Sequence, residues 1–578
     1  MEILRSVLRE LPEFQQLLAA LDGGQSPVAV SGLAAVHRAH FAACLGQESG
    51  RPVVMVCADE GEAERMARDL SFLTGGEVPV LAARSFLFHN IATVSRQWEH
   101  RRLRLLYRLT RGEIPCLVAT VEALLQRTLP PEALERACAV LEVGQTADLE
   151  ELTAHLTQAG YVRCEQVEGP GQFALRGGIL DVYSPAMEAP VRAEFFGDEV
   201  DALGIFDPGT QRRTANVEKA VLLPAAETLL HLAPGGLAGL LKQLDRRSAA
   251  AVQDGLEELA ATLRQDREAL EEGRSFPVAD RYLPLIYPEL ATAVDYLPYD
   301  ACVLFSESSR VGERAKTWQW QLEEDVKTLL ERGELDGTCG ALSRSYEQLC
   351  RRLEDFPFAY LDSFALSAYP AAPRCVLSLM AKQLPSFGAS LETAVQDLSH
   401  YQSAGFSVLV LVSSEQRALN LQTLLREQKV KSGVDFTLKA LPRPGQILLT
   451  VGGLSGGMEY PGLKLAVITE GQSGGAKKRP RPVKKEATNR QKLKSYADLS
   501  PGDLVVHEHH GVGRYVGMVK MPADGIEKDY VKIAYAGTDV LYVPATQLDL
   551  VSKYIGGGED AQETKKLSKL GGTDWERA

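Results

Sequence analysis

Residues 27–36 read PVAVSGLAAV, an apolar strand that ends in Ser31 and Gly32 and is followed by a helical pattern. A strand over 27–30 is followed by a helix over 35–45, and the same alternation repeats through residue 120. Buried strands that alternate with amphipathic helices are typical of a parallel, doubly wound sheet. We therefore predict an α/β protein whose first domain begins in residues 1–122 and is completed by residues 214–335.

The turn after this first strand has the position of a phosphate loop but lacks the chemistry of one. A working loop needs a Lys for the phosphate oxygens and a Ser or Thr for the magnesium ion. Gly32 is present, whereas Ala35 and Val36 occupy those two positions. Farther along, Ser306 stands where a metal-binding Asp would follow a strand, and Glu307 comes next. We expect a degenerate, inactive nucleotide site of the P-loop type; the alternative is that neither segment was ever a phosphate site.

Residues 123–213 have a different pattern of polar and apolar residues, which predicts one helix followed by short alternating segments separated by glycines. This pattern predicts an inserted α+β module built on an antiparallel sheet. The module carries Arg163, Arg176, Arg192 and Glu194, and the last two share one face of a strand. Because guanidinium groups pair well with carboxylates, these side chains indicate an Arg-rich recognition surface. Ordinary surface charge is the alternative.

The remaining chain divides into four predicted segments. Residues 336–471 again alternate strands and helices and form a second α/β domain of unassigned role. Residues 472–494 are basic and contain Pro and Gly, which favours a flexible linker, with contact to nucleic acid or an acidic partner as the alternative. Short strands in 495–555 predict a small β-barrel of SH3 or Tudor type. Residues 556–578 begin a linker or helix.

Composition excludes several classes of protein. The 63 basic and 76 acidic residues give a net charge of −13, which argues against a protein that coats nucleic acid. No apolar run approaches the roughly 20 residues of a membrane span. Nine scattered cysteines without a C-x-x-C pair favour reduced, cytoplasmic thiols. The histidines at 507, 509 and 510 are near-adjacent on an expected strand and point apart, so we expect no metal site.

Two strings of residues identify the chain further. The first is Phe173-x-x-Arg176-Gly177-x-Ile179-x-Asp181 with Arg192-x-Glu194-Phe195-Phe196 and Phe206-Asp207-Pro208. The second is His507-x-x-His510-Gly511-Val512-Gly513-Arg514-Tyr515, followed by Leu541-Tyr542-Val543-Pro544. Together with residues 29–36 they resemble the N-terminal half of the bacterial transcription-repair coupling factor family (Mfd), whose first part is similar to the excinuclease B subunit.

This resemblance implies two partners. The inserted module would dock the excinuclease A subunit through Arg163, Arg176, Arg192, Glu194 and Phe195, although Ala174 replaces one arginine of the family's pattern. The barrel would bind the RNA polymerase β subunit by pairing an exposed strand edge with it. The polymerase-contacting positions implied in this way are Val506, His507, Glu508, His509, Gly511, Arg514 and Tyr515.

We therefore expect an adaptor in transcription-coupled DNA repair, without catalytic residues or cofactors of its own. In the family, ATP, magnesium and double-stranded DNA are bound mainly by translocase domains, which would lie beyond Ala578. The alternative is an active ATP-dependent DNA helicase or a repair nuclease subunit, which requires a nucleotide site that the sequence does not show.

Overall fold

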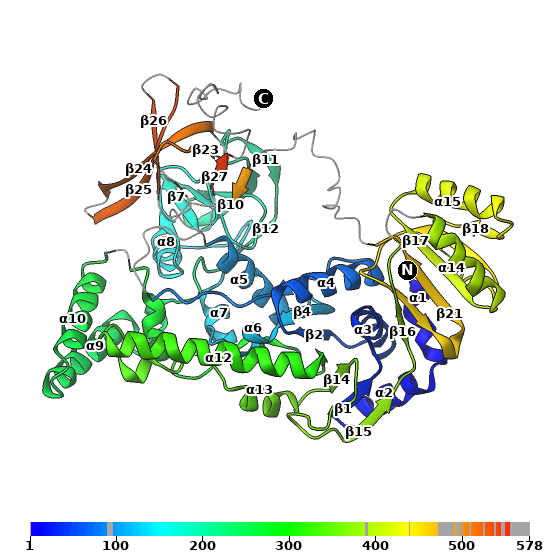
Figure 1. The fold of residues 1–578 in the computed structure, drawn as a ribbon. Helices are drawn as coiled ribbons and strands as arrows, with labels where there is room; N and C mark the ends of the chain where they lie inside the picture. Colours follow the sequence, from blue (N-terminus) through cyan, green and yellow to red (C-terminus); the bar gives the residue numbers. More distant parts are fainter. Residues whose placement is uncertain are drawn as a thin grey trace.

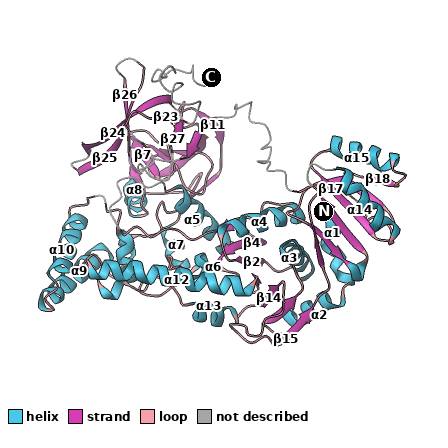
Figure 2. Cartoon of the chain, viewed as in Figure 1, coloured by secondary structure: helices cyan, strands magenta, loops and turns pink. Residues whose placement is uncertain are grey.

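The structure is a computed structural model, and it gives the chain as two α/β domains, an inserted module and a small β-domain (Figure 1). It describes residues 2–88, 96–274, 276–387, 391–438, 440–471, 490–492, 499, 501–507, 510–523, 526–536, 539–544 and 550–554. The expected tail over 556–578 and most of the expected linker over 472–494 lie outside these residues. Figure 2 shows the helices gathered in the two α/β domains and the strands of the module and the β-domain grouped together.

The first domain is built on a seven-stranded sheet in the order β15-β1-β14-β13-β2-β4-β3, and every pairing in it is parallel. Its strands are β1 (Val28–Ser31), β2 (Val53–Cys57), β3 (Val80–Leu81), β4 (Cys116–Thr120), β13 (Cys302–Ser306), β14 (Phe358–Asp362) and β15 (Cys375–Ser378). Its longer helices are α2 (Pro12–Asp22), α3 (Ala35–Ser49), α4 (Glu60–Thr74), α5 (Gln97–Thr110), α9 (Gly236–Gln253), α10 (Glu257–Glu271) and α12 (Ser308–Glu331). The shorter ones are α1 (Glu2–Ser6), α6 (Val121–Leu125), α7 (Pro131–Ala137), α11 (Leu283–Ile286) and α13 (Tyr346–Leu353).

This sheet confirms the doubly wound prediction and moves its boundary. Residue 335 was the expected end of the domain, but β14 and β15 pair with β1 on its two sides, so the domain continues to Ser378. The apolar strand β14 was assigned to the second domain because sequence alone does not show which sheet a strand joins. The hydrogen bonds between β14 and β1, which lie more than 300 residues apart in the sequence, assign β14 to the first domain.

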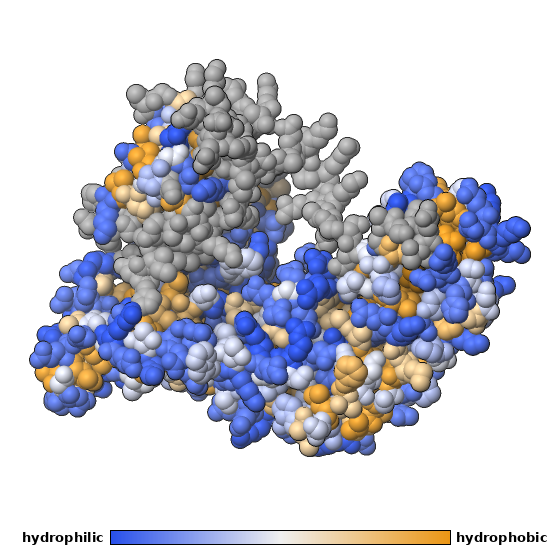
Figure 3. All heavy atoms as spheres, viewed as in Figure 1, coloured by the Kyte–Doolittle hydropathy of each residue, from blue (hydrophilic) through white to orange (hydrophobic). Residues whose placement is uncertain are grey.

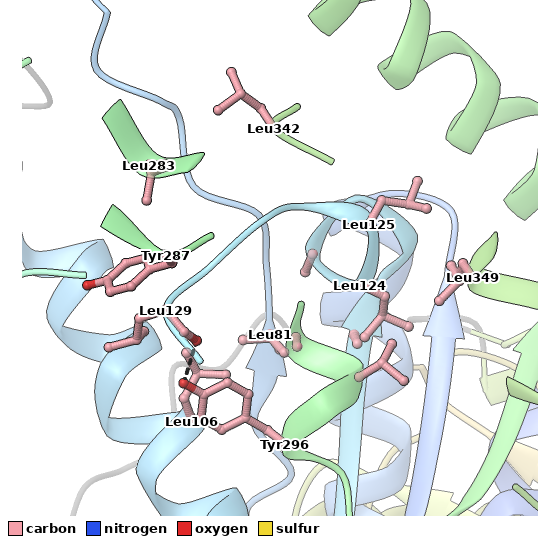
Figure 4. Close-up of a cluster of buried hydrophobic side chains, with 14 of the residues drawn as sticks. Leu81, Leu106, Leu124, Leu125, Leu129, Leu283, Tyr287, Tyr296, Leu342 and Leu349 are labelled. Atoms are coloured by element: carbon pink, nitrogen blue, oxygen red, sulfur yellow. Dashed lines mark hydrogen bonds between the residues drawn. The ribbon is translucent and has the colours of Figure 1, made fainter. Parts of the chain in front are cut away.

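Apolar side chains pack on both faces of the sheet. On one face, Leu106, Leu124, Leu129 and Tyr296 belong to a cluster in which the Tyr296 hydroxyl donates to the carbonyl of Leu129 at 2.8 Å (Figure 4). Burying side chains of this size stabilises each by roughly 1.5–3 kcal/mol relative to exposure. The other face is covered by α1 to α4 and continues into the second domain, so the two α/β domains share one core.

The second α/β domain is a six-stranded mixed sheet in the order β16-β20-β21-β17-β19-β18. Its elements are β16 (Lys382–Leu384), α14 (Leu391–Ser403), β17 (Ser407–Val412), α15 (Glu415–Glu427), β18 (Ser432–Val434), β19 (Ile447–Val451), β20 (Gly457–Tyr460) and β21 (Leu465–Thr469). The Tyr460 hydroxyl lies 2.9 Å from Nδ1 of His40 on α3, which ties this domain to the first.

The inserted module is a six-stranded sheet in the order β11-β10-β9-β8-β7-β6, backed by α8 (Leu149–Gln158). Its strands are β6 (Val162–Arg163), β7 (Gln172–Arg176), β8 (Ile179–Val182), β9 (Val191–Phe196), β10 (Glu199–Phe206) and β11 (Arg213–Asn216). A separate pair, β5 (Ala139–Glu142) with β12 (Lys219–Leu222), joins the module to the first domain. The module therefore spans about 139–222 rather than 123–213, since residues 121–125 form α6 in the core of the first domain.

The small β-domain is an antiparallel sheet in the order β22-β27-β23-β24-β25-β26. Its strands are β22 (Arg490–Lys492), β23 (Leu504–His507), β24 (Gly511–Ala523), β25 (Ile526–Ala534), β26 (Val540–Pro544) and β27 (Val551–Tyr554). Residues 490–492, expected in the linker, form its first strand. Among the pairings described, none joins β22 to β26, so the described strands form one curved sheet in the place of the small barrel of SH3 or Tudor type that the sequence predicted.

The surface in Figure 3 is mainly hydrophilic, with separate apolar patches. Within the described part of the chain, none of the helices combines the length and the apolar character that a bilayer crossing requires.

Candidate functional site

The residues predicted to form a degenerate nucleotide site lie at the ends of β1 and β13, and their polar groups bond to other parts of the protein. The N–H of Gly32 donates to the carbonyl of Ser363 at 3.3 Å, and the N–H of Leu33 donates to the carbonyl of Asp362 at 3.0 Å. These are the backbone donors that a phosphate would need. A Cβ built on Gly32, whose φ is +91°, would lie 2.0 Å from the carbonyl oxygen of Leu379.

Ion pairs and hydrogen bonds occupy the rest of this site. Arg38, almost fully buried on α3, pairs with Glu307 and donates to the carbonyl of Leu33 at 2.9 Å. Ser306 donates to Oε1 of Glu62 at 2.7 Å instead of facing a metal. Ala35 begins α3 and Val36 is buried in the core. The five predicted residues of the degenerate site therefore lie together, and their polar groups bond to protein.

The inserted module presents a polar face on the side of its sheet opposite to α8. Asp181 on β8 is fully buried and lies directly opposite Arg192 on β9. Arg192 donates from Nε and Nη2 to the two carboxylate oxygens at 2.7 and 2.9 Å, and Arg176 donates from Nη2 at 2.5 Å. The guanidinium of Arg192 also lies 4.8 Å from the ring centre of Phe206.

This arrangement fixes two arginines while leaving part of each exposed. The side chain of Arg176 is 50% exposed and that of Arg192 is 20% exposed, whereas Asp181 does not reach solvent. Hydrogen bonds that Arg192 donates to Asp181 raise the pKa of Arg192 further above its usual value, against the opposing effect of partial burial, so its charge is permanent. A shared buried carboxylate holds both guanidinium groups in one orientation, which lowers the entropy cost of binding an acidic partner.

A third arginine and the predicted glutamate extend the polar face. Glu194 follows Arg192 on the same side of β9 and accepts from Nη1 of Arg213 at 3.1 Å. Gly204 lies beneath the side chain of Arg213, because a Cβ at this position would be 1.8 Å from its Nε atom. We call Arg176, Arg192, Glu194 and Arg213 the arginine face.

Two predicted residues of the module lie outside the arginine face. Phe195 points to the opposite side of β9 and packs against the hydrophobic core under α8, as alternation along a strand requires. Phe196 shares the side of Arg192 and Glu194 and is 84% exposed. Arg163 is exposed on β6, in register with the core residue Phe173 and two strands from Asp181, so the structure does not bring it to the other arginines.

The predicted polymerase-binding residues are mostly internal to the small β-domain. Val506, His507 and Tyr515 are buried, and β23 lies between β24 and β27, so none of these offers a free strand edge. Gly511 is also buried, and Arg514 donates to the carbonyl of Gly502 at 3.2 Å. Glu508 and His509 lie outside the described residues.

Open edges occur elsewhere in this sheet. Beyond Arg514, the paired residues of β24 face β25 on one side and no described strand on the other. This edge carries Val516, which is 44% exposed, and the partly buried Met518 and Val519. Among the described strands, β22 and β26 end the sheet, and Tyr542 on β26 is 38% exposed.

Comparison with known proteins matches the two segments that carry these surfaces. The UvrB interaction domain family matches residues 140–227, which contain the arginine face, and the CarD-like/TRCF RID domain family matches residues 499–555. The transcription-repair-coupling factor of Bacillus subtilis (strain 168) is 31% identical over 584 residues. The chain is a homologue of the transcription-repair-coupling factors.

The similarity to the transcription-repair-coupling factors runs along the whole chain. The alignment with the Bacillus subtilis protein covers 100% of this chain and 49% of the relative. The protein of Staphylococcus haemolyticus (strain JCSC1435) is 29% identical, with 96% of this chain and 47% of the relative covered, and that of Staphylococcus aureus (strain MRSA252) is 28% identical, with 100% and 49% covered. The chain thus spans about half the length of these curated relatives, and the family predicted from its sequence strings is confirmed.

Sequence reasoning did not single out two residues on this face of the module of the transcription-repair-coupling factor homologue, the buried Asp181 and the exposed Phe196. Asp181 stood in the quoted string, but nothing in the sequence showed that it is the buried partner of two arginines. Phe196 could have been found, because residues 192, 194 and 196 share one face of a strand by simple alternation.

Proposed function

We propose that this chain is an adaptor in transcription-coupled DNA repair. The arginine face would recruit the excinuclease A subunit, and the small β-domain would bind the β subunit of RNA polymerase. The observation that carries the proposal is the Asp181 arrangement, which holds Arg176 and Arg192 ready for acidic groups within the segment that matches the UvrB interaction domain. ATP-driven movement on double-stranded DNA belongs, in this proposal, to the part of the relatives that this chain does not span.

The chain's own nucleotide fold serves as a scaffold in this proposal. The backbone donors of the loop are engaged by Ser363 and Asp362, and Arg38 is neutralised by Glu307. A triphosphate would have to break both sets of contacts, and no Lys is present there to neutralise it. This argues against the competing function of an active helicase or nuclease subunit driven from this site.

Binding of the excinuclease A subunit to variants tests the first partner. Arg176→Ala and Arg192→Ala should each weaken capture at least tenfold, because truncating an interface hot-spot arginine costs about 2 kcal/mol or more, and a tenfold change is about 1.4 kcal/mol. Lys219→Ala is the matched control, since Lys219 pairs with Glu142 at the base of the same module. Arg163→Ala shows whether the surface extends to β6. Undiminished capture by both arginine-face variants would place the site elsewhere.

The polymerase contact is proposed for the edge of β24 beyond Arg514, where no described strand pairs and an extended strand of the partner would continue the sheet. Backbone hydrogen bonds supply affinity in this mode, and alternate side chains such as Val516 supply specificity. Val516→Lys should abolish binding to the β subunit, because a charged side chain on an edge blocks strand addition. Tyr542→Lys changes the other open edge and should leave binding intact; the reverse result would assign the contact to β26.

A further inference from the structure

The small β-domain and the inserted module meet at a group of three side chains with metal-binding chemistry. Figure 1 draws the small β-domain over the inserted module, and the 3.7 Å approach of His510 to Glu168 places the two in contact. Glu168 comes from the loop between β6 and β7, while His507 ends β23 and His510 belongs to the turn that leads into β24. One potential ligand atom from each residue lies within 4.8 Å of the other two.

The turn explains why the sequence predicted no such site. His507 and His510 were expected on one strand, where neighbouring side chains point apart. In the structure His507 is in register with Gly511 across a tight hairpin, so the chain reverses between the two histidines. Their rings lie 4.6 Å apart, centre to centre, and are inclined by 34°. The third group comes from a loop more than 300 residues away, which no spacing rule connects to them.

Burial and charge favour a cation at this place. His507 is fully buried, and the side chains of His510 and Glu168 are 25% and 26% exposed. Nε2 of His510 lies 3.7 Å from Oε1 of Glu168. A divalent cation would be held by two neutral imidazoles and one carboxylate in a half-enclosed position.

We propose that Glu168, His507 and His510 form a binding site for a divalent transition metal, with Zn²⁺ as the preferred ion, that ties the small β-domain to the inserted module. Two imidazoles and a carboxylate suit Zn²⁺, which leaves a fourth position for water or a partner's ligand. Tetrahedral binding at about 2.0–2.1 Å brings ligand atoms to about 3.3 Å from one another, so separations of up to 4.8 Å need to close by up to about 1.5 Å. The partly exposed Glu168 and His510 side chains provide this movement.

Such a site would couple two surfaces that are otherwise separate. The loop of Glu168 is bonded to the arginine face, since the Gln211 side chain donates to the carbonyl of Val167 at 3.0 Å and Arg192 donates to the carbonyl of Gln211 at 3.4 Å. Metal binding would therefore fix the small β-domain beside the arginine face. The inference does not depend on which proteins the two surfaces bind.

Metal titration of the full 578-residue chain tests the proposal. After treatment with EDTA and its removal, ZnCl₂ is added in a calorimeter, and CoCl₂ is added in parallel to read ligand type from visible absorption. His510→Gln and Glu168→Gln should each weaken one Zn²⁺ site at least tenfold, because each removes one of three ligands. His507 is left unchanged, since it is buried and its replacement would disturb folding. His400→Gln, an exposed histidine on α14, is the matched control and should bind as the original chain does.

A second control and a second measurement make the result decisive. Cys164 is half-buried near Glu168, so Cys164→Ser should retain the site; its loss would assign the metal to a thiol and overturn the proposal. Zn²⁺ should also slow hydrogen exchange in both the 164–171 loop and the β23–β24 turn. Protection confined to one of the two segments, or equal Zn²⁺ binding by His510→Gln, Glu168→Gln and the original chain, would show that the site does not bridge the domains.

Discussion

Asp181→Asn is the change that most directly tests how the arginine face is built. Asp181 is fully buried and accepts three hydrogen bonds from two guanidinium groups, at 2.5, 2.7 and 2.9 Å. Asparagine keeps one acceptor oxygen but places an NH₂ donor against a guanidinium, so about two charged hydrogen bonds are lost. Each is worth about 1.5–3 kcal/mol, and rehydration of the half-exposed Arg176 reduces the total, so we expect the local stability to fall by about 2–3 kcal/mol.

Hydrogen exchange of the strands around Asp181 is the suitable assay, because none of the chain's tryptophans lies within 139–222 and intrinsic fluorescence would not report this module. A loss of 2–3 kcal/mol corresponds to roughly 30- to 150-fold faster exchange in peptides covering β8 and β9. Capture of the excinuclease A subunit should weaken in parallel, since both arginines lose their fixed orientation.

A double-mutant cycle provides the control. Once Arg192 is changed to Gln, most of the partners of Asp181 are already gone, so Asp181→Asn should cost much less in that background than in the original chain. If Asp181→Asn leaves both exchange and capture unchanged, Asp181 does not organise the surface. If the two effects simply add in the double variant, the two residues act independently and the reasoning fails.

Three further predictions concern the first domain. Gly32→Ala should lower the free energy of unfolding by about 3 kcal/mol or more in urea titrations, because its Cβ would meet the carbonyl of Leu379 and φ is +91°; an unchanged midpoint would contradict this. Ala35→Lys combined with Val36→Thr restores the motif's residue types but should not restore MgATP binding by calorimetry, and micromolar affinity would refute the scaffold assignment. Burial lowers the pKa of His40 and His100 to about 4, so the unfolded chain takes up protons first as the pH falls below about 6.5. The free energy of unfolding should therefore decline by roughly 3 kcal/mol per histidine down to pH 4. His100→Asn should reduce this pH dependence, as measured by urea midpoints between pH 6.5 and pH 4.

Local pattern predicted much of the fold. The alternation of apolar strands and amphipathic helices was sufficient to predict the parallel sheet around β1, because burial on both faces leaves continuous apolar runs such as Val53–Cys57. It did not assign β14 or β15 to that sheet, since an apolar strand fits either of two neighbouring sheets. Only the hydrogen-bonded neighbours of such a strand show which of the two sheets it joins.

The sites were predictable to different extents. Ala35 and Val36 alone predicted that a phosphate loop here would lack its Lys and its Ser or Thr, and alternation predicted that Arg192 and Glu194 share one strand face. The buried role of Asp181 did not follow, because a carboxylate between arginines in sequence is equally compatible with an exposed ion pair. The approach of Glu168 to His510 depends on domain packing, which leaves no periodic signal in the chain.

The carbonyl of Leu379 beside Gly32 has a consequence for how this domain can change over evolutionary time. A missing lysine is a side-chain loss that one substitution reverses. The obstruction by Leu379 belongs to the backbone, and it is held by the bond from the Leu379 N–H to the carbonyl of Ser31 at 2.9 Å. No single substitution removes a main-chain atom, so recovering the loop would require β15 and the segment after it to leave the sheet. In the proposed scaffold role, selection would therefore act on the packing that supports the arginine face rather than on the residues at positions 35 and 36.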